Sequence, residues 1–156
     1  MPTVSLWWKP GCATNTRQIG LLREAGCEVV VHDLLTEAWT ADALSAFFGA
    51  RPVREWFNPA APAVKAGTVV PTDFSAEAAL ARLVAEPLLI RRPLIEVNGE
   101  RCCGFDAVWL VQRGIRLLDG TVPQGCSHAH SGDVAECKPP RNPAAYCAPP
   151  SGASFP

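Results

Sequence analysis

The chain has 156 residues, of which 48% are apolar, and this is enough to bury one hydrophobic core. Its 14 basic and 15 acidic residues leave a formal net charge of −1. This balance argues against a general nucleic-acid binder, which shows a basic stripe, and no apolar run is long enough to span a membrane. The first residues lack the basic start and long apolar stretch of a secretory signal, so we expect a cytoplasmic protein with neither nucleic acid nor membrane as a partner.

The first part of the chain predicts a strand–helix–strand unit. Residues 3–8 are β-branched and aromatic, which is typical of a strand. Apolar residues then recur at helical spacing over 14–25, and Gly26 follows where a helix end favours a left-handed residue. Residues 28–32 predict a second strand. Such a unit opens an α/β fold with a parallel pair of strands.

The middle of the chain predicts a helical insertion over about residues 37–86 rather than another strand–helix repeat. It combines two helices with side-chain caps, a short helical turn and a loop rich in proline. These segments are 41–48 after Thr40, 52–57, 59–71, and 76–85 after Ser75.

The α/β pattern then resumes and closes the domain. Residues 94–97 and 100–103 predict two strands, joined by Asn98-Gly99, the strongest two-residue hairpin signal. Asp106 caps a final helix that we expect to run through Leu117 and to close near Gly120. The predicted order is strand, helix, strand, helical insertion, hairpin, helix.

From residue 121 the composition shifts to proline, glycine, serine and alanine. Such a segment buries too little apolar surface to become ordered, so we expect a folded domain over 1–120 and a disordered tail over 121–156. The tail contains five side chains of the kind that bind zinc: Cys126, His128, His130, Cys137 and Cys147. Their spacing matches no standard zinc motif, so weak adventitious affinity is favoured over a metal site, and we expect no bound metal.

The seven cysteines are an odd number, which excludes a complete disulfide framework. In a reducing compartment such residues are more often buried, redox-active or metal-binding. We expect Cys27 to be a buried packing residue. Cys102 and Cys103 are adjacent on one strand, so we expect one to face the core and the other to face outward.

Cys12 is the sharpest candidate for a functional residue. It lies between the first strand and the first helix, where the unpaired N–H groups and the helix dipole favour both a thiolate and a bound oxyanion. Arg17, one turn into the helix, adds positive charge. Placement alone leaves open both a reactive thiol and a passive loop cysteine. The residue three positions later is Asn15, so there is no CxxC, and a redox cycle needs a distant cysteine or an external thiol such as glutathione.

Arg91-Arg92-Pro93 is the second candidate. A proline directly before a strand is a good place for a cis peptide bond. The two arginines beside it can bind an oxyanion bidentately. The alternative is a pair of solvated surface arginines, and the residues alone favour it because exposed charges are common.

These two segments together resemble the glutaredoxin-linked arsenate reductase family, which includes the Spx-type regulators. The matching stretches are KPGCATNTRQ over 9–18 and PLLIRRPL over 87–94. Four shorter stretches resemble the nitrogenase-associated branch of that family: LLTEAWT from Leu34, FFG from Phe47, EWFN from Glu55 and GFD from Gly104. The resemblance covers about residues 2–118.

The resemblance implies a thioredoxin-like fold with a helical subdomain inserted between the second strand and the C-terminal hairpin. In the reductases of this family a cysteine attacks arsenate, glutathione attacks the adduct, and glutaredoxin regenerates the thiol. Cys12 matches that nucleophile, Arg92 matches an arginine that binds the oxyanion, and Pro93 matches a proline expected to be cis. The resemblance implies no bound cofactor, with glutathione and glutaredoxin as the reductant.

The chain also departs from the pattern of the reductases. Where they carry two further oxyanion arginines, this sequence has Asn58 and Gly104. Arg54 or Arg91 could take their place. The CxxC switch common in Spx regulators is absent, so we do not expect a transcriptional role.

Three functional hypotheses follow. The first is a nitrogen-fixation-associated protein with a redox-active thiol at Cys12 and nitrogenase or its assembly machinery as partner. The second is a glutathione- and glutaredoxin-dependent arsenate reductase or a related thiol oxidoreductase. The third is a metal-handling accessory that acts through the Cys/His tail.

Overall fold

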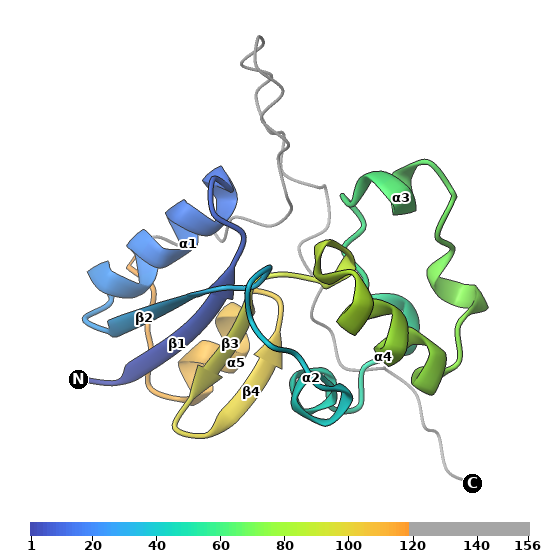
Figure 1. Ribbon diagram of the computed structural model, residues 1–156. Coiled ribbons are helices and arrows are strands. Elements are labelled where there is room, and N and C mark those ends of the chain that lie inside the picture. Colours follow the sequence, from blue (N-terminus) through green and yellow to red (C-terminus); the bar gives the residue numbers. More distant parts are fainter. Residues whose placement is uncertain (119–156) are drawn as a thin grey trace, which may run out of the picture.

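The computed structural model describes residues 1–118 (Figure 1). The tail expected over 121–156 lies outside the described residues. The helices and strands are β1 Thr3–Trp8, α1 Ala13–Glu24, β2 Glu28–Asp33, α2 Ala41–Phe48, α3 Pro62–Lys65, α4 Ala76–Ala85, β3 Leu94–Val97, β4 Glu100–Cys103 and α5 Ala107–Gln112. Three short 3₁₀ turns join them: η1 Val53–Glu55, η2 Pro71–Asp73 and η3 Pro87–Leu89.

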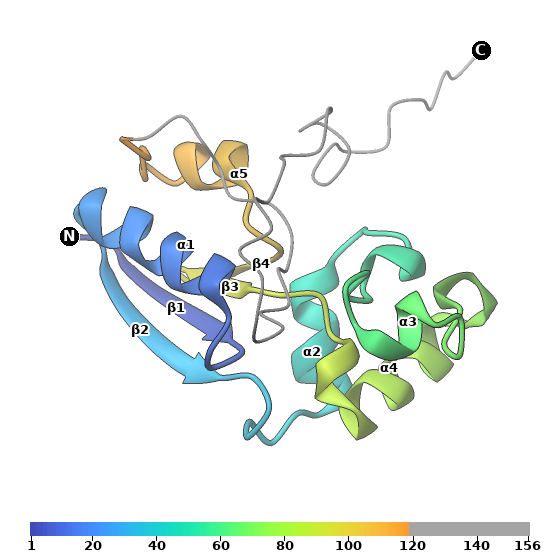
Figure 2. The same cartoon turned by 90° about the horizontal axis from the view of Figure 1, so that it is seen from above.

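The four strands form one mixed sheet in the order β2-β1-β3-β4. The pair β1–β2 is parallel, and the pairs β1–β3 and β3–β4 are antiparallel. Helices α1 and α5 cover one face of the sheet, whereas α2 to α4 gather beside it (Figures 1 and 2). The α/β fold with a helical insertion between the second strand and the hairpin is therefore confirmed.

Two hydrophobic clusters hold these layers. Val4 and Leu6 of β1 pack with residues of α1, β3 and α5 in the first cluster. The second joins the opposite side of the sheet to the helical subdomain, and in it the rings of Phe48 and Trp56 stack at 4.7 Å between centroids. Trp56 and Phe57 are both buried in this second cluster.

The side-chain caps lie where the sequence predicts them. Thr40 and Ser75 each accept a backbone N–H in the first turn of α2 and α4, and Asp106 accepts two at the start of α5. The region 59–71 is not wholly a loop, because α3 lies within it. Pro62 occupies the first turn of α3, where a helix needs no N–H donor, and its fixed φ favours the helical conformation.

Helix α5 ends earlier than predicted. Gly114 adopts a φ of 80°, and the N–H of Ile115 donates to the carbonyl of Leu110 at 3.0 Å, which closes the helix well before Leu117. Ile115 and Leu110 are both buried in the first cluster, so this turn also anchors the chain on the sheet. Gly26 ends α1 with the same kind of turn, as predicted.

Strand β4 buries both of its cysteines. Cys102 is 5% exposed and Cys103 is fully buried, so the expectation that one of them faces outward is wrong. Both faces of the sheet are covered at this point, one by the α1 and α5 layer and the other by the helical subdomain. Cys27 is buried, as predicted.

Among the helices of residues 1–118, none has the length and apolar character needed to cross a membrane.

Candidate active site

Cys12 is the N-cap residue of α1, with φ −81° and ψ 112°. Its N–H donates to the carbonyl of Lys9 at 3.1 Å, and its carbonyl accepts from the N–H of Thr16 at 3.0 Å. The residue is 4% exposed, whereas its neighbours Gly11 and Ala13 are exposed. The thiol therefore lies just below the surface at a helix start, where the N–H groups of the first turn favour an anion.

Two buried amides fix the loop that carries Cys12. Asn15 Oδ1 accepts from the N–H of Lys9 at 3.4 Å, and Asn15 Nδ2 donates to Gln18 Oε1 at 2.8 Å. Asn15 and Gln18 are 1% and 2% exposed. Sequence reasoning missed this pair, although its signal was present: both residues share a helix face with the apolar Ile19 and Leu22.

Arg92 and Pro93 lie at the same end of the sheet as Cys12. The Arg92–Pro93 peptide bond is cis, the geometry expected for Pro93. In the antiparallel pair β1–β3, Trp7 lies opposite Leu94, so the chain that leaves β1 and the chain that enters β3 meet at one end of these strands. Figures 1 and 2 both show the start of α1 and the start of β3 at this end.

Both arginines of this segment are buried, each only 9% exposed, so the solvated alternative is wrong. The reason is that the segment runs between the sheet and the helical subdomain, where the N–H of Arg91 donates to the carbonyl of Trp56 at 2.9 Å. Nε and Nη1 of Arg92 are buried and have no hydrogen-bond partner among the described residues. A buried guanidinium with unpaired donors calls for an explanation, and a bound anion supplies one.

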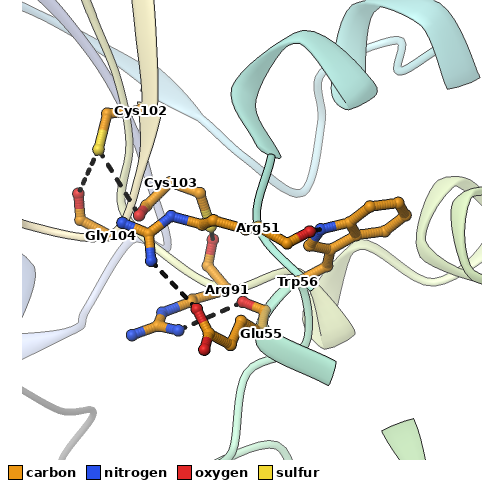
Figure 3. Close-up of polar contacts among 7 residues, drawn as sticks. All are labelled: Arg51, Glu55, Trp56, Arg91, Cys102, Cys103 and Gly104. Carbon is orange, nitrogen blue, oxygen red and sulfur yellow. Dashed lines mark hydrogen bonds and ion pairs between the residues drawn. The ribbon is translucent and has the colours of Figure 1, made fainter. Parts of the chain in front are cut away.

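Arg91 lies close to Gly104, and Figure 3 shows its hydrogen bond to the backbone carbonyl of Glu55. Its Nε is 3.5 Å from the point where a Cβ on Gly104 would be, and its Nη1 donates to the carbonyl of Glu55 at 3.3 Å. Gly104 has a φ of 88°, which favours glycine. The guanidinium of Arg91 therefore lies beside Gly104, one of the two positions where the reductases carry an arginine and this sequence does not.

Arg51 joins this group, although the sequence analysis did not select it. Its Nη1 lies 3.3 Å from Oε2 of Glu55, and its carbonyl accepts from Nε1 of Trp56 at 2.9 Å (Figure 3). The i,i+4 spacing of Arg51 and Glu55 was the available signal. It did not identify the site, because such pairs are common on exposed surfaces.

The other candidate residues take different positions. Asn58 is 2% exposed, and its Oδ1 accepts from the N–H of Ala60 at 3.0 Å, so it shapes a turn. Arg54 is exposed and lines a pocket together with Arg91. Arg17 is an exposed residue of α1, one turn beyond Cys12.

Cys27 is a buried cysteine directly before β2. Burial raises the pKa of the Cys27 thiol above its usual value of 9.0, and the positive amino terminus opposes this shift in part.

No group of three potential metal ligands occurs within residues 1–118. The tail cysteines and histidines lie outside the described residues.

Comparison with protein-family models gives no match. One curated relative, described as an uncharacterized 15.7 kDa protein in the draG 3′ region of Rhodospirillum rubrum, is 49% identical over 106 residues, which is 68% of this chain and 74% of the relative.

Solved structures of low sequence identity share the fold. A protein described as related to the ArsC family, from Bacteroides fragilis, has a TM-score of 0.61 at 20% identity, over 70% of this chain and 95% of that one. An arsenate reductase from Vibrio cholerae has a TM-score of 0.57 at 23% identity, over 66% of this chain and 90% of that one. For an arsenate reductase (ArsC) related protein from Brucella melitensis the TM-score is 0.54 at 21% identity, over 70% and 92% of the two chains.

Proposed function

Because the chain belongs to the same family as the 15.7 kDa protein of the Rhodospirillum rubrum draG 3′ region and has the fold of ArsC-type proteins, we propose that it is a thiol-dependent redox protein with Cys12 as its nucleophile. The observation that carries this proposal is the buried guanidinium of Arg92, whose Nε and Nη1 have no partner among the described residues. It lies at the end of the sheet where α1 begins with Cys12. A nucleophile and an anion-binding group at one end of the sheet suit attack on an oxyanion or on a disulfide with a negative charge.

Attack on an oxyanion such as arsenate proceeds in two steps. The thiolate of Cys12 displaces one oxygen of the oxyanion, which leaves as water after protonation, and a sulfur–arsenic bond forms. An external thiolate then attacks the Cys12 sulfur. The sulfur–arsenic bond breaks with its electron pair on arsenic, so arsenate is reduced to arsenite and a mixed disulfide remains at Cys12.

Glutathione and glutaredoxin complete the cycle in this proposal. A thiolate of glutaredoxin attacks the glutathione sulfur of the mixed disulfide, which releases the Cys12 thiolate and leaves the glutathione on glutaredoxin. An external thiol is needed because no CxxC partner follows Cys12. The same cycle runs without arsenate when Cys12 reacts directly with a glutathione disulfide.

The test is to incubate the full chain with oxidised glutathione and locate the modified cysteine by peptide mass spectrometry. We expect a mixed disulfide at Cys12 that glutaredoxin removes, and none at that position in Cys12→Ser. Cys27→Ser is the matched control, because Cys27 is a buried packing residue. Arsenate turnover is measured with the same three proteins. The proposal is overturned if the unmodified sequence forms no mixed disulfide at Cys12, or if it turns over arsenate and Cys12→Ser does so at the same rate.

A second part of the proposal concerns the setting in which the protein acts. Four stretches of this chain resemble the nitrogenase-associated branch of the arsenate reductase family, and the relative that is 49% identical is named for its position in the draG 3′ region. The resemblance supports a role in nitrogen fixation, with nitrogenase or its assembly machinery as the partner. Co-purification from nitrogen-fixing and nitrogen-replete cells tests it: nitrogenase components are expected only in the first preparation, and their absence from both would refute it.

A further inference from the structure

A pocket of about 350 Å³ lies on the face of the sheet opposite α1 and α5. Val4 and Leu6 of β1 pack toward those two helices, so the alternation along a strand directs Ser5 and Trp7 to the opposite face. Both line the pocket, together with residues of the other three strands, of α2 and of the segment before α2. The volume falls within the range of about 300–1,000 Å³ that is typical of small-molecule sites.

Aromatic rings form one wall of this pocket. The ring of Trp7 stacks on that of His32 at 4.6 Å between centroids and meets Phe47 edge to face at 5.2 Å. Trp39 lies 6.0 Å from Trp7 and 5.9 Å from Phe47, and its Nε1 donates to the carbonyl of Leu34 at 2.9 Å, which fixes the ring. The negative faces of tryptophan and phenylalanine rings attract a cation, so this wall favours a positively charged organic ligand.

One part of the wall holds a cation of the chain itself. The guanidinium carbon of Arg101 lies 5.4 Å from the centroid of the Phe47 ring, and Nε of Arg101 donates to Oε2 of Glu96 at 2.7 Å. A ring face together with an adjacent carboxylate therefore accommodates a positive charge at this wall. Arg101 and Glu96 neutralise each other, so this part of the pocket adds no net charge.

The other part of the wall has the same two components without a cation. Nε1 of Trp7 donates to Oε2 of Glu37 at 2.8 Å, which holds this carboxylate at the edge of the indole ring. Within residues 1–118, Glu37 forms no ion pair with a lysine or an arginine. With His32 neutral, the lining therefore carries one net negative charge, and this charge lies beside the rings of Trp7 and Trp39.

From this combination we propose that the pocket binds a small quaternary ammonium compound, with its positive charge against the rings of Trp7 and Trp39 and beside the carboxylate of Glu37. A primary ammonium group is a strongly hydrated charge that would exchange its water for ring surface. A quaternary ammonium group carries no N–H donors, and its methyl groups pack directly on aromatic rings. This site is separate from the proposed reaction, because neither Cys12 nor Arg92 lines the pocket.

The test is a titration of the isotopically labelled full chain, followed by the indole Nε1–H signals of Trp7 and Trp39 in its NMR spectrum. The probe is choline, and its matched neutral analogue is the alcohol that has a carbon in place of the choline nitrogen. We expect choline to shift both signals to saturation, and the neutral analogue to bind about threefold more weakly or less, because it lacks the attraction of the rings and the carboxylate for a cation. Sodium chloride at the same concentrations should leave both signals in place.

Substitutions then identify the charge that the ligand meets. Glu37→Gln is expected to weaken the binding of choline about threefold, which is typical of an exposed ion pair, and to leave the binding of the neutral analogue unchanged. Glu24→Gln is the matched control, because Glu24 is an exposed carboxylate of α1 on the opposite face of the sheet. It should leave both affinities unchanged.

Four results would each overturn the proposal: no saturable shift of the two indole signals with choline, the same shifts with sodium chloride, a neutral analogue that binds as tightly as choline, or equal affinity for choline in Glu37→Gln and Glu24→Gln. Failure here is distinguishable from failure of the proposed function. The titration needs no reaction at Cys12, and the mixed-disulfide assay does not depend on Glu37.

Discussion

Replacing Arg92 by methionine should make the folded protein more stable and less able to bind an anion. Arg92 is 9% exposed, and its Nε and Nη1 are buried without partners among the described residues. Each buried polar group without a partner costs about 1–3 kcal/mol, and exchanging a buried charged group for an apolar one of similar size is often stabilising by about 1–4 kcal/mol. We therefore expect Arg92→Met to raise the free energy of unfolding by about 1–3 kcal/mol, or the Tm by about 4 °C for each kcal/mol.

The assay is urea denaturation of the full chain, with and without phosphate or arsenate. An anion that binds only the folded protein stabilises it by about 2.7 kcal/mol at a hundred times its Kd, so the unmodified sequence should gain stability with anion concentration and Arg92→Met should not. Arg82→Met is the control, because the exposed Arg82 is paired with Glu86. The reasoning is refuted if Arg92→Met is less stable than the unmodified sequence and still gains stability from the anion.

Three further predictions concern the frame around the site. Asn15→Ala should lower the free energy of unfolding by about 1–2 kcal/mol in urea denaturation, because it removes two hydrogen bonds, one to Gln18 Oε1 and one from the N–H of Lys9. An unchanged free energy of unfolding would contradict a stabilising role for these bonds. Gly104→Ala should lower it by about 1–2 kcal/mol, because alanine is strained at a φ of 88°; an unchanged value would show that this backbone relaxes. Burial raises the pKa of Cys27, so the folded state keeps a proton that the unfolded state loses. Its contribution to stability is therefore complete below pH 9.0 and is lost as the pH rises above it. Cys27→Ala should lessen that decline, and an identical pH profile would contradict the shift.

The backbone frame was largely predictable from the sequence because its signals are local. Thr40, Ser75 and Asp106 cap helices within three residues of themselves, and Asn98-Gly99 joins two strands directly. The early end of α5 also has a local signal, because Gly114 adopts the left-handed conformation that ends a helix. The burial of both Cys102 and Cys103 has none, because it depends on the helices that cover the two faces of β4.

The geometry of the site was less predictable, because it depends on contacts between segments far apart in the chain. No local pattern shows that Arg91 and Arg92 are buried, since their burial follows from the packing of Trp56 and Phe57 against the segment before β3. The placement of Arg91 over Gly104 is likewise a contact across the fold. Cys12 was predictable as a helix N-cap, because the strand before it and the helix after it are both local features.

The most direct test of the central claim, that Cys12 and Arg92 serve one anion-binding thiol site, is a comparison of two alkylating reagents. Iodoacetate is an anion and iodoacetamide is neutral, so the ratio of their rates at Cys12, followed by peptide mass spectrometry, reports the positive charge beside the thiol. We predict that Arg92→Met lowers this ratio, because only the anionic reagent loses an attraction, and that Arg82→Met leaves it unchanged. A ratio at Cys12 that is the same in Arg92→Met as in the unmodified sequence would contradict the claim.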